Sequence, residues 1–514
     1  MRLSYQSLVT SMMAPVTALF LTSCAVGPNY KEPATPPAAG YTSNPLATTS
    51  SVTNLPGGEA QSFIAGQDIA FDWWKTFQCP QLSRLVDEAL SRNASITAAW
   101  AALRQAKEQV YAQQGAYYPS VNADYSLTRQ TVAGNLANSS SPGWQANGID
   151  IAPLQSSSPP YNSALTWTMH VAQLTVGYTP DIFGLNRRTV ESLDAQAAMQ
   201  RFELDAAYTS LASSVVGAAI QEASTRSQME ATKKIIDANV KMLAALKNQR
   251  NSGYACDVAV AAQEAALAQV EAALPTLQKQ LEQTRDLIRA LVDNLPDQDV
   301  PETFQFSSLH LPQDLPLSLP SDIIRQRPDV RAAEENMRSM NAQVGAAIAN
   351  RLPEFTITAN GSGSATLFTE MFSHGGPGWS IAGDVSQPVF QGFTLLHRQR
   401  AAKQAWIQAK AQYRSTVIAA FENVADTLHA LESDADALKA TDRAEHAARH
   451  SLDLATAQYQ TGYANYLALL SAEQTYDQAV INTVQALANR YADTAALFEA
   501  LGGGWWNRPD LTKN

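Results

Sequence analysis

The chain contains two copies of one long unit, and this duplication constrains its fold more than any other feature. Residues 92–121 align without a gap on residues 326–355, and residues 249–269 align on residues 458–478. A repeat of this length is far longer than the roughly 20–50 residues of a solenoid module. We therefore expect two half-proteins that follow the same path in space, so that each half does the same thing beside the other.

The first residues predict a secreted lipoprotein. Arg2 is the only charge before the mostly apolar stretch 8–21, which is too short to span a bilayer as a mature helix and is typical of a secretory signal. The stretch ends in Leu-Thr-Ser-Cys at Cys24, which resembles the lipoprotein box, where a peptidase cuts before the cysteine and that cysteine carries the lipid. Ala25 rather than an aspartate follows, which by resemblance to lipoprotein sorting favours the outer membrane. The alternative is an ordinary signal with a chance cysteine.

The boundaries of the parts follow from composition and from the repeat. Residues 25–60 are rich in Pro, Thr, Ser and Gly, which predicts an extended tether with little structure of its own. The expected parts are a signal peptide at 1–23, a lipid-anchored tether at 24–70, a first repeat at 71–294, a linker at 295–328, a second repeat at 329–501 and a tail at 502–514.

Charge and cysteine content limit the partners. The net charge is −11, or −12 once Arg2 is removed, which argues against nucleic acid as a partner. Besides Cys24 the chain has Cys79 and Cys256, which nothing in the sequence brings together, so we interpret both as free thiols. No stretch other than the signal is apolar enough for an ordinary transmembrane helix.

Helical periodicity dominates the rest of the chain. From Val417 to Leu438 apolar residues recur at alternating steps of four and three, which is the seam of a coiled coil. Long helices at about 1.5 Å per residue would reach about 95–100 Å, far beyond a globular core. Gly253 and Gly462 supply the helix-ending conformation at the tips of two hairpins. We expect long helices at about 188–251 and 396–461, returning helices at about 256–294 and 465–501, and shorter helices at about 95–115 and 329–350.

Between the short and the long helix of each half, polar and apolar residues alternate. Residues 120–127 follow this period of two, and residues 355–360 repeat it in the second half. Residues 174–178 and 379–386 predict the strands paired with them. An apolar outer face and a polar inner face are typical of a transmembrane barrel strand, and equally of a half-buried soluble hairpin.

The number of strands bears on whether they form a transmembrane barrel or a soluble hairpin. Each half offers one strand pair, hence four strands per chain, whereas an outer-membrane barrel needs at least about eight strands and tolerates no open edge in lipid. If the strands lie in the membrane, several chains must therefore contribute to one barrel. The loops at about 129–171 and 362–378 would then face outward.

Five short motifs carry a resemblance that covers nearly the whole chain. They are Phe71, Asp72, Trp73 and Trp74; Asp181, Ile182, Phe183 and Gly184; Arg327, Pro328, Asp329, Val330, Arg331, Ala332, Ala333 and Glu334; Tyr466, Leu467, Ala468, Leu469 and Leu470; and Leu501, Gly502, Gly503, Gly504 and Trp505. Together they resemble the outer-membrane factor family, the channel component of tripartite efflux pumps and type I secretion systems. They resemble specifically its lipoprotein branch, the nodulation-factor-transport type.

The resemblance implies a mainly α fold with membrane β, in which three chains build a 12-stranded β-barrel continued by a 12-helix coiled-coil α-barrel. The linker 295–328 and the terminal segments would form an equatorial collar. The implied function is a passive exit duct for drugs or other small molecules. Its implied partners are a periplasmic adaptor protein and an inner-membrane pump of the resistance-nodulation-division type, which mainly selects the substrates.

Two groups of site residues are expected near the tips. Gly253, Tyr254, Ala255, Gly462, Tyr463 and Ala464 should meet the adaptor through exposed backbone and small side chains. By resemblance, a leucine and, four residues later, an aspartate form a periplasmic gate. Leu467 matches the leucine, but Ser471 occupies the second position, and three hydroxyls lack the field of three carboxylates. We expect closure to rely on Leu467, with cation affinity weakened unless Asp257 or Glu473 compensates. The alternative is that Ser471 packs between helices.

No motif indicates an enzyme, so we expect no catalytic residue, no metal and no cofactor. His446 and His450 lie one helical turn apart, but without a third ligand nearby a solvated face is the simpler interpretation. Two other functions stay open, a duct for secreted proteins and a structural coiled-coil lipoprotein of the envelope. Single-channel conductance would separate a duct from a scaffold.

Overall fold

The computed structural model describes residues 25–34, 40–42, 46–53, 55–132, 144–146, 149–151, 165–373 and 375–508. Its internal contacts divide the chain into two compact units. The first unit comprises Met1–Asn29, Gln109–Ser192 and Asn341–Gln404, and the second comprises Tyr30–Glu108, Leu193–Met340 and Ala405–Asn514. Each unit therefore combines parts of both sequence repeats.

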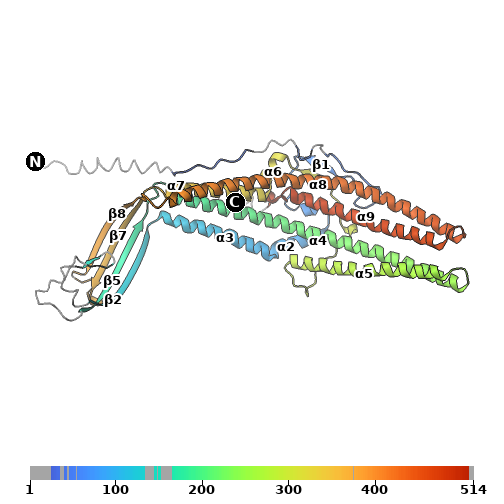
Figure 1. Cartoon of the computed structure of the whole chain (residues 1–514), viewed down its shortest axis with the longest axis horizontal. Helices are drawn as coiled ribbons and strands as arrows, with labels where there is room; N and C mark the ends of the chain where they lie inside the picture. Colours follow the sequence, from blue (N-terminus) through green and yellow to red (C-terminus); the bar gives the residue numbers. More distant parts are fainter. Residues whose placement is uncertain are drawn as a thin grey trace, which may run out of the picture. The chain divides into compact units, whose positions relative to one another are not determined.

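Two helical hairpins repeat the same path along the chain (Figure 1). Helix α4 spans Leu185–Asn251 and is followed by α5, Asp257–Leu291, whereas α8 spans Thr394–Gln460 and is followed by α9, Tyr466–Ala500. The long helices have 67 residues each and the returning helices 35 each, so the two hairpins have equal lengths. The four expected helices are confirmed.

The coiled-coil seam of α8 is buried in the second unit. Val424, Leu431 and Leu438 are 0 % exposed, while Asp426, His429, Glu432, Ser433 and Asp436 between them are exposed. Phe421 is half-buried and packs against Tyr41 with ring centroids 5.8 Å apart. The alternating steps of four and three therefore identify the buried face of this helix.

The remaining elements are shorter. Helices α3, Ala94–Gln114, and α7, Pro328–Ala349, lie where they were expected. The elements that the sequence did not predict are α2 (Pro80–Arg92), α6 (Pro320–Gln326), the parallel pair β1 (Ser62–Ala65) and β6 (Asp314–Leu317), the hairpin β3 (Trp144–Ala146) and β4 (Ile149–Ile151), and the 3-10 turns η1 (Trp73–Phe77), η2 (Gly115–Tyr117), η3 (Phe306–Ser308), η4 (Phe368–Glu370) and η5 (Trp505–Asn507).

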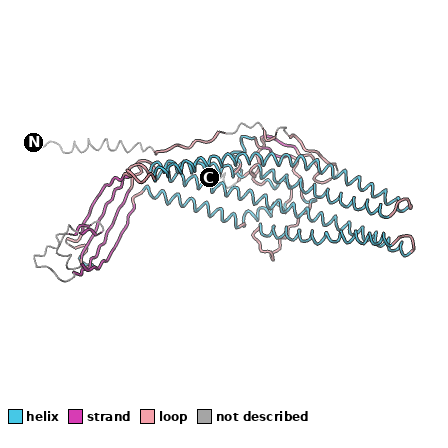
Figure 2. Tube along the Cα trace, in the orientation of Figure 1, coloured by secondary structure: helices cyan, strands magenta, loops and turns pink. Residues whose placement is uncertain are grey.

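The first unit contains an antiparallel sheet of four strands in the order β2-β5-β7-β8 (Figure 2). Its strands are β2, Ser120–Val132, β5, Leu165–Tyr178, β7, Glu354–Ala365, and β8, Pro377–Ser386. The pair β2-β5 comes from the first repeat and β7-β8 from the second, and β5 pairs with β7 to join them. The four expected strands are confirmed. Among the described residues, β2 and β8 each pair along one edge only.

The register places apolar residues from all four strands on one face. Ala123 lies opposite Leu174, Leu174 opposite Gly361, and Gly361 opposite Trp379. The large exposed apolar residues of this face are Val121, Tyr125, Leu127, Leu174, Ile357, Trp379, Ile381 and Val385. One residue along, the row of Asn122, Thr175, Asn360 and Ser380 lies on the opposite face. The expected separation of an apolar from a polar face is therefore confirmed for the strand residues predicted from the sequence, whereas Trp167, Met169 and Val171 in the outer part of β5 lie on the face of the polar row.

The segment after the signal corrects one expectation. Its described residues carry little regular structure, but they are packed and do not form a free tether. Arg490 of α9 is 0 % exposed and donates to Thr49 Oγ1 at 3.2 Å and to the backbone oxygen of Glu59 at 2.5 Å. The Tyr41 hydroxyl donates to the backbone oxygen of Ser318 at 2.9 Å. The described residues of this segment have few backbone hydrogen bonds of their own. Their polar groups are instead paired with groups from distant parts of the second unit.

Aromatic residues and glycines fix the end of α9. Trp73 stacks on Phe498 with centroids 4.9 Å apart, and both side chains are almost completely buried. Gly503 has a φ of 67° and its N–H donates to the backbone oxygen of Phe498 at 2.8 Å, which closes the helix. A Cβ at Gly504 would lie 2.5 Å from the backbone oxygen of Ala70. The glycine run therefore ends the last helix, as expected, and also permits close packing.

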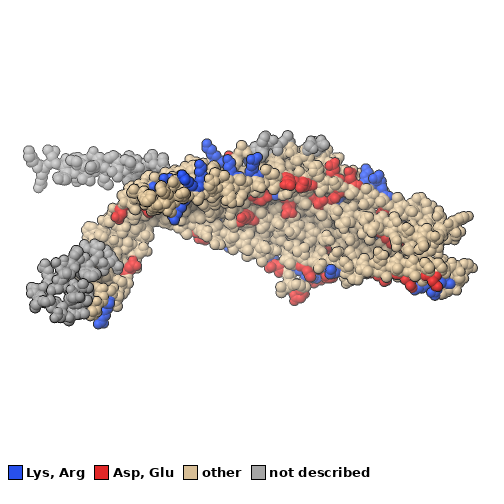
Figure 3. Space-filling model, viewed as in Figure 1, with Lys and Arg blue, Asp and Glu red and all other residues tan. Residues whose placement is uncertain are grey.

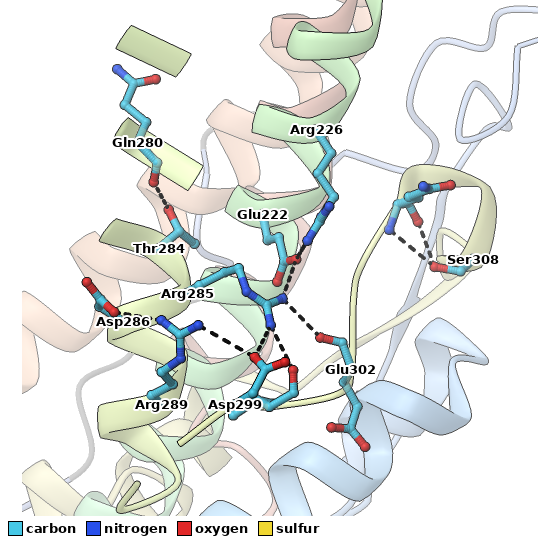
Figure 4. Close-up of polar contacts among 12 residues, drawn as sticks. Glu222, Arg226, Gln280, Thr284, Arg285, Asp286, Arg289, Asp299, Glu302 and Ser308 are labelled. Carbon is cyan, nitrogen blue, oxygen red and sulfur yellow. Dashed lines mark hydrogen bonds and ion pairs between the residues drawn. The ribbon is translucent and has the colours of Figure 1, made fainter. Parts of the chain in front are cut away.

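An arginine on α5 forms hydrogen bonds with the loop that follows this helix (Figure 4). Arg285 donates to Glu222 Oε1 on α4 at 3.2 Å, to Asp299 Oδ1 at 2.8 Å and to the backbone oxygen of Val300 at 2.8 Å. Glu222 is 0 % exposed and also accepts from Arg226 Nε at 2.7 Å. One guanidinium thus joins α4, α5 and the start of the linker, so the base of the first hairpin is held by charge-assisted hydrogen bonds.

Candidate functional site at the hairpin tips

Both hairpins turn through the same backbone motif. At the first tip, the N–H of Gly253 donates to the backbone oxygen of Arg250 at 2.9 Å, and the N–H of Tyr254 donates to that of Gln249 at 2.8 Å. This pair of bonds is the Schellman closure, which needs a left-handed residue, and Gly253 has a φ of 79°. The second tip repeats both bonds, with Gly462 at a φ of 78°. The turn geometry therefore explains both glycines.

The residues after each glycine project from the second unit. Tyr254 and Tyr463 are each 88 % exposed, whereas Ala255 and Ala464 are half-buried. A Cβ at Gly253 or Gly462 would meet no heavy atom within 4 Å. The six tip residues expected from the sequence thus comprise two exposed aromatic rings, two half-buried alanines and two glycines with open space around them.

The two tips differ in charge (Figure 3). At the first tip, Arg250 lies 3.8 Å from Asp257, and Lys247 forms an ion pair with Glu264 at 2.8 Å. At the second tip, residues 454–472 contain no charged side chain. In Figure 3 the visible ends of α8 and α9 are correspondingly tan, while blue and red side chains gather near the tip that joins α4 and α5. The duplicated turns therefore carry different surfaces.

Two tyrosines of the second hairpin bind the first hairpin. The Tyr459 hydroxyl donates to Gln249 Oε1 at 2.6 Å. The Tyr466 hydroxyl donates to Gln263 Oε1, and Gln263 Nε2 donates to Asn239 Oδ1 at 2.9 Å. Gln263 and Asn239 are 0 % and 2 % exposed, so the second of these networks is shielded from water. Separation of the hairpins would break both connections.

An apolar cluster surrounds this network. Its buried members come from α4, α5 and α9 and are Leu246, Ala259, Val260, Ala266, Tyr466, Leu469 and Leu470. The rings of Tyr459 and Tyr466 pack edge to face with centroids 5.9 Å apart. The tips are thus held together by apolar packing as well as by the two hydroxyls.

The two expected gate residues lie on one face of α9. Leu467 is 53 % exposed and Ser471 is also exposed, and a separation of four residues places them one above the other. The Ser471 backbone oxygen accepts from Thr475 Oγ1 at 2.8 Å. Within the single chain the Ser471 side chain therefore lies at the surface, beside Leu467.

The two acids considered as substitutes for the missing aspartate lie in different environments. Asp257 is exposed, with 90 % of its side chain accessible. Glu473 is 6 % exposed, and this burial raises the pKa of its carboxyl group. One turn further along α9, burial and the proximity of Glu473 raise the pKa of Asp477 to about 7. Of the two candidates, Asp257 alone is at the surface of the chain.

The expected lipid attachment site, Cys24, lies outside the described residues. The residues directly after it are fixed in the first unit, because the N–H of Val26 donates to the backbone oxygen of Phe183 at 3.1 Å. Arg188 of α4 donates to the backbone oxygen of Val26 at 3.0 Å and to Asn29 Oδ1 at 2.8 Å. Of the other cysteines, Cys79 is buried and Cys256 exposed, and both are free thiols.

Within the described ranges, no three His, Cys, Asp or Glu side chains are grouped so that they could hold a metal ion. No helix in the described part of the chain is long and apolar enough to cross a membrane.

Sequence reasoning missed the connections between the hairpins. It identified Gln249 only as a repeated position, and it did not assign a role to Tyr459, Gln263 or Asn239. A tyrosine three residues before the second glycine, where the first repeat has Arg250, is a signal in the sequence. This break in the repeat could have indicated a contact made by one hairpin alone.

Comparisons with known proteins agree with this architecture. The family model described as "Outer membrane efflux protein" matches residues 85–293 and 319–503. The chain is 27 % identical over 495 residues to outer membrane protein OprJ of Pseudomonas aeruginosa, which covers 96 % of this chain and 95 % of the relative. It is 25 % identical over 502 residues to the toluene efflux pump outer membrane protein TtgC of Pseudomonas putida, with 96 % and 95 % covered.

Solved structures show the same fold. The outer-membrane channel OprN is similar with a TM-score of 0.77 at 24 % identity, covering 94 % of this chain and all of that one. The outer membrane protein VceC from Vibrio cholerae is similar with a TM-score of 0.74 at 24 % identity, covering 85 % of this chain and all of the other. The similarity thus extends over both helical hairpins and the four-stranded sheet.

Proposed function

The chain belongs to the outer membrane efflux protein family, and we infer that it is the outer-membrane exit duct of an efflux pump. It is located in the outer membrane, and its helical part extends into the periplasm. The feature of the chain that best supports a duct is the four-stranded sheet, whose apolar face is exposed and whose two outer strands each have an unpaired edge among the described residues.

We propose that three copies close these edges. Open sheet edges do not occur in the hydrocarbon region of a membrane, because unpaired backbone groups there have no water to bind. With β8 of one chain beside β2 of the next, three chains give a closed barrel of 12 strands and expose the apolar face to lipid. The long hairpins of the three chains would supply the 12 helices of a coiled-coil tunnel.

The tips and the gate residues are proposed to form the entrance of this tunnel. Leu467 of three chains would form an apolar ring, with Ser471 one turn further in. The tyrosine bonds between the hairpins keep the two tips of each chain together and thereby favour a closed entrance. The exposed Tyr254 and Tyr463 and the open backbone beside them are suited to contact an adaptor protein.

The substrates and partners are proposed by analogy. The relatives include proteins named for toluene efflux and for pyoverdine export. We propose that this chain exports drugs or other small organic molecules together with a periplasmic adaptor and an inner-membrane pump of the resistance-nodulation-division type. Cys24 is proposed to carry the lipid that anchors the N-terminus to the outer membrane.

Reconstitution tests the duct. The purified full-length protein, inserted into planar bilayers, should produce discrete conductance steps, and it should migrate as a trimer in mild detergent. Deletion of the gene should raise the accumulation of toxic small molecules in the cell, and expression of the intact chain should reverse this rise. A trimer that inserts but conducts no ions under any condition would instead support a structural envelope protein.

A further inference from the structure

A groove in the second unit, remote in sequence from the tips, has no role in the duct as proposed. It has a volume of about 400 Å³ and is lined by Glu32, Arg201, Phe202, Arg325, Arg331 and Trp505. These residues come from the N-terminal segment, α4, α6, α7 and the C-terminal segment. Three arginines and one glutamate give the groove a positive balance in a chain whose net charge is −11.

The floor of the groove is rigid. Phe202 is 8 % exposed, and the Arg331 guanidinium lies 5.1 Å from its ring centroid. Trp505 packs edge to face on Phe202 at 5.6 Å, and its indole N–H donates to the backbone oxygen of Gln326 at 2.5 Å. Arg331 is also held by Glu334, with 2.5 Å between Nη1 and Oε2. These contacts keep two aromatic rings and one guanidinium in place before any ligand binds.

The two other arginines are available for a ligand. Arg201 and Arg325 are exposed, and neither forms an ion pair with a described residue. Arginines nearby in the sequence do form such pairs, since Arg327 lies 2.6 Å from Asp329 and Arg338 lies 3.7 Å from Glu335. Two of the three groove arginines therefore lack a neutralising carboxylate of their own, whereas the third, Arg331, is paired with Glu334.

The combination of charges defines the ligand. A guanidinium presents paired N–H donors that match the two oxygens of a carboxylate. Glu32 would repel a compact, doubly charged anion such as phosphate, but it can accept hydrogen bonds from an ammonium group. The rings of Phe202 and Trp505 can contact the apolar part of a small chain.

We propose that this groove binds a short acidic peptide with a free amino group. The peptide carboxylates lie against Arg201 and Arg325, and its amino group lies toward Glu32. This assignment is independent of conduction by the duct, because it concerns a surface distant in sequence from both tips and from the sheet.

Binding of a defined peptide tests the proposal on the intact, detergent-solubilised protein. The probe is the free tripeptide alanyl-glutamyl-glutamate, which has one amino group and three carboxylates, with its fully amidated glutamine analogue and inorganic phosphate as comparisons, measured by calorimetry. An open, solvated site should give a dissociation constant of about 0.1–1 mM for the free peptide. Arg201→Gln and Arg325→Gln should each weaken binding by about tenfold, whereas Arg104→Gln, a change at an exposed arginine of α3 outside the groove, should leave it unchanged.

Glu32→Gln separates the peptide from a simple anion. It should weaken binding of the peptide, because the amino group loses its partner, and strengthen binding of phosphate, because a repulsive charge is removed. The proposal is overturned if the free peptide does not bind saturably below about 10 mM, or if phosphate binds the unaltered protein as tightly as the peptide. Equal weakening by Arg104→Gln would also overturn it, since the effect would then reflect overall charge. Because the changed side chains are exposed and unpaired, folding should be unaffected, which the thermal midpoint of each variant verifies.

Discussion

The buried tyrosine bond between the hairpins should control how readily the entrance opens. Tyr466→Phe removes the hydroxyl that donates to Gln263 Oε1, while the ring and its packing remain. Gln263 is 0 % exposed, so its oxygen is left without a partner and without water. An unsatisfied buried acceptor costs about 1–3 kcal/mol. If opening separates the hairpins, the cost falls on the closed state only, and the ratio of open to closed channels rises by about 5- to 150-fold.

Single-channel recording in planar bilayers measures this ratio directly. Tyr463→Phe serves as the matched control, because that side chain is 88 % exposed and its loss of a hydroxyl leaves no buried group unsatisfied. Tyr459→Phe should have a smaller effect than Tyr466→Phe, because its partner Gln249 is half-buried and can bind water instead. If Tyr466→Phe leaves the open fraction unchanged while trimer abundance is normal, the bond does not hold the closed state and the reasoning is refuted.

Four further outcomes are expected. Cys24→Ala should abolish palmitate labelling but leave trimer assembly largely intact, because the barrel holds the protein in the membrane; labelling that persists would exclude lipid attachment at this residue. Gly462→Trp should lower drug resistance while trimer abundance stays normal, and equal loss of both would make the glycine purely structural. Leu467→Ala should raise basal conductance, and Ser471→Asp should increase block by multivalent cations added from the periplasmic side; a wild-type channel already blocked strongly, and unchanged by Ser471→Asp, would place the acidic ring elsewhere. The pKa of Asp477 is raised to about 7 by burial and by Glu473, so its contribution to stability is complete below about pH 4 and is lost as the pH rises through 7. The thermal midpoint should accordingly fall between pH 5 and pH 8 in the wild type and fall less in Asp477→Asn, and identical profiles would contradict the assignment.

The regular elements of this protein could be predicted because each depends on a local period. The seam from Val417 to Leu438 repeats every seven residues, and the strand at 120–127 alternates with period two, so the buried face of each can be read from a few residues. Gly253 and Gly462 mark the tips because a left-handed residue is needed there. Because the chain is duplicated, a pattern found in one repeat could also be compared with the matching residues of the other repeat.

Contacts between distant segments could not be predicted in the same way. The segment 25–60 has the composition of a linker, and its bonds with Arg490 depend on where α9 lies, some 430 residues further along the chain. The same holds for Tyr466 and Gln263, which come from different repeats. A polar residue on a helix gives no sign in the sequence of which distant residue it will meet.

The difference in charge between the two tips determines how many kinds of site a partner would encounter. A chain with two equivalent hairpins, present three times, would offer six equal tips around the entrance. Because Arg250 and Asp257 occur at one tip and the other is uncharged from 454 to 472, the six tips fall into two sets of three. An adaptor that binds all six must use two modes of contact, one weakened by salt and one insensitive to it. In a ring of six identical adaptor subunits, neighbouring subunits would therefore bind in two different modes. The contacts around the ring would then lack sixfold symmetry.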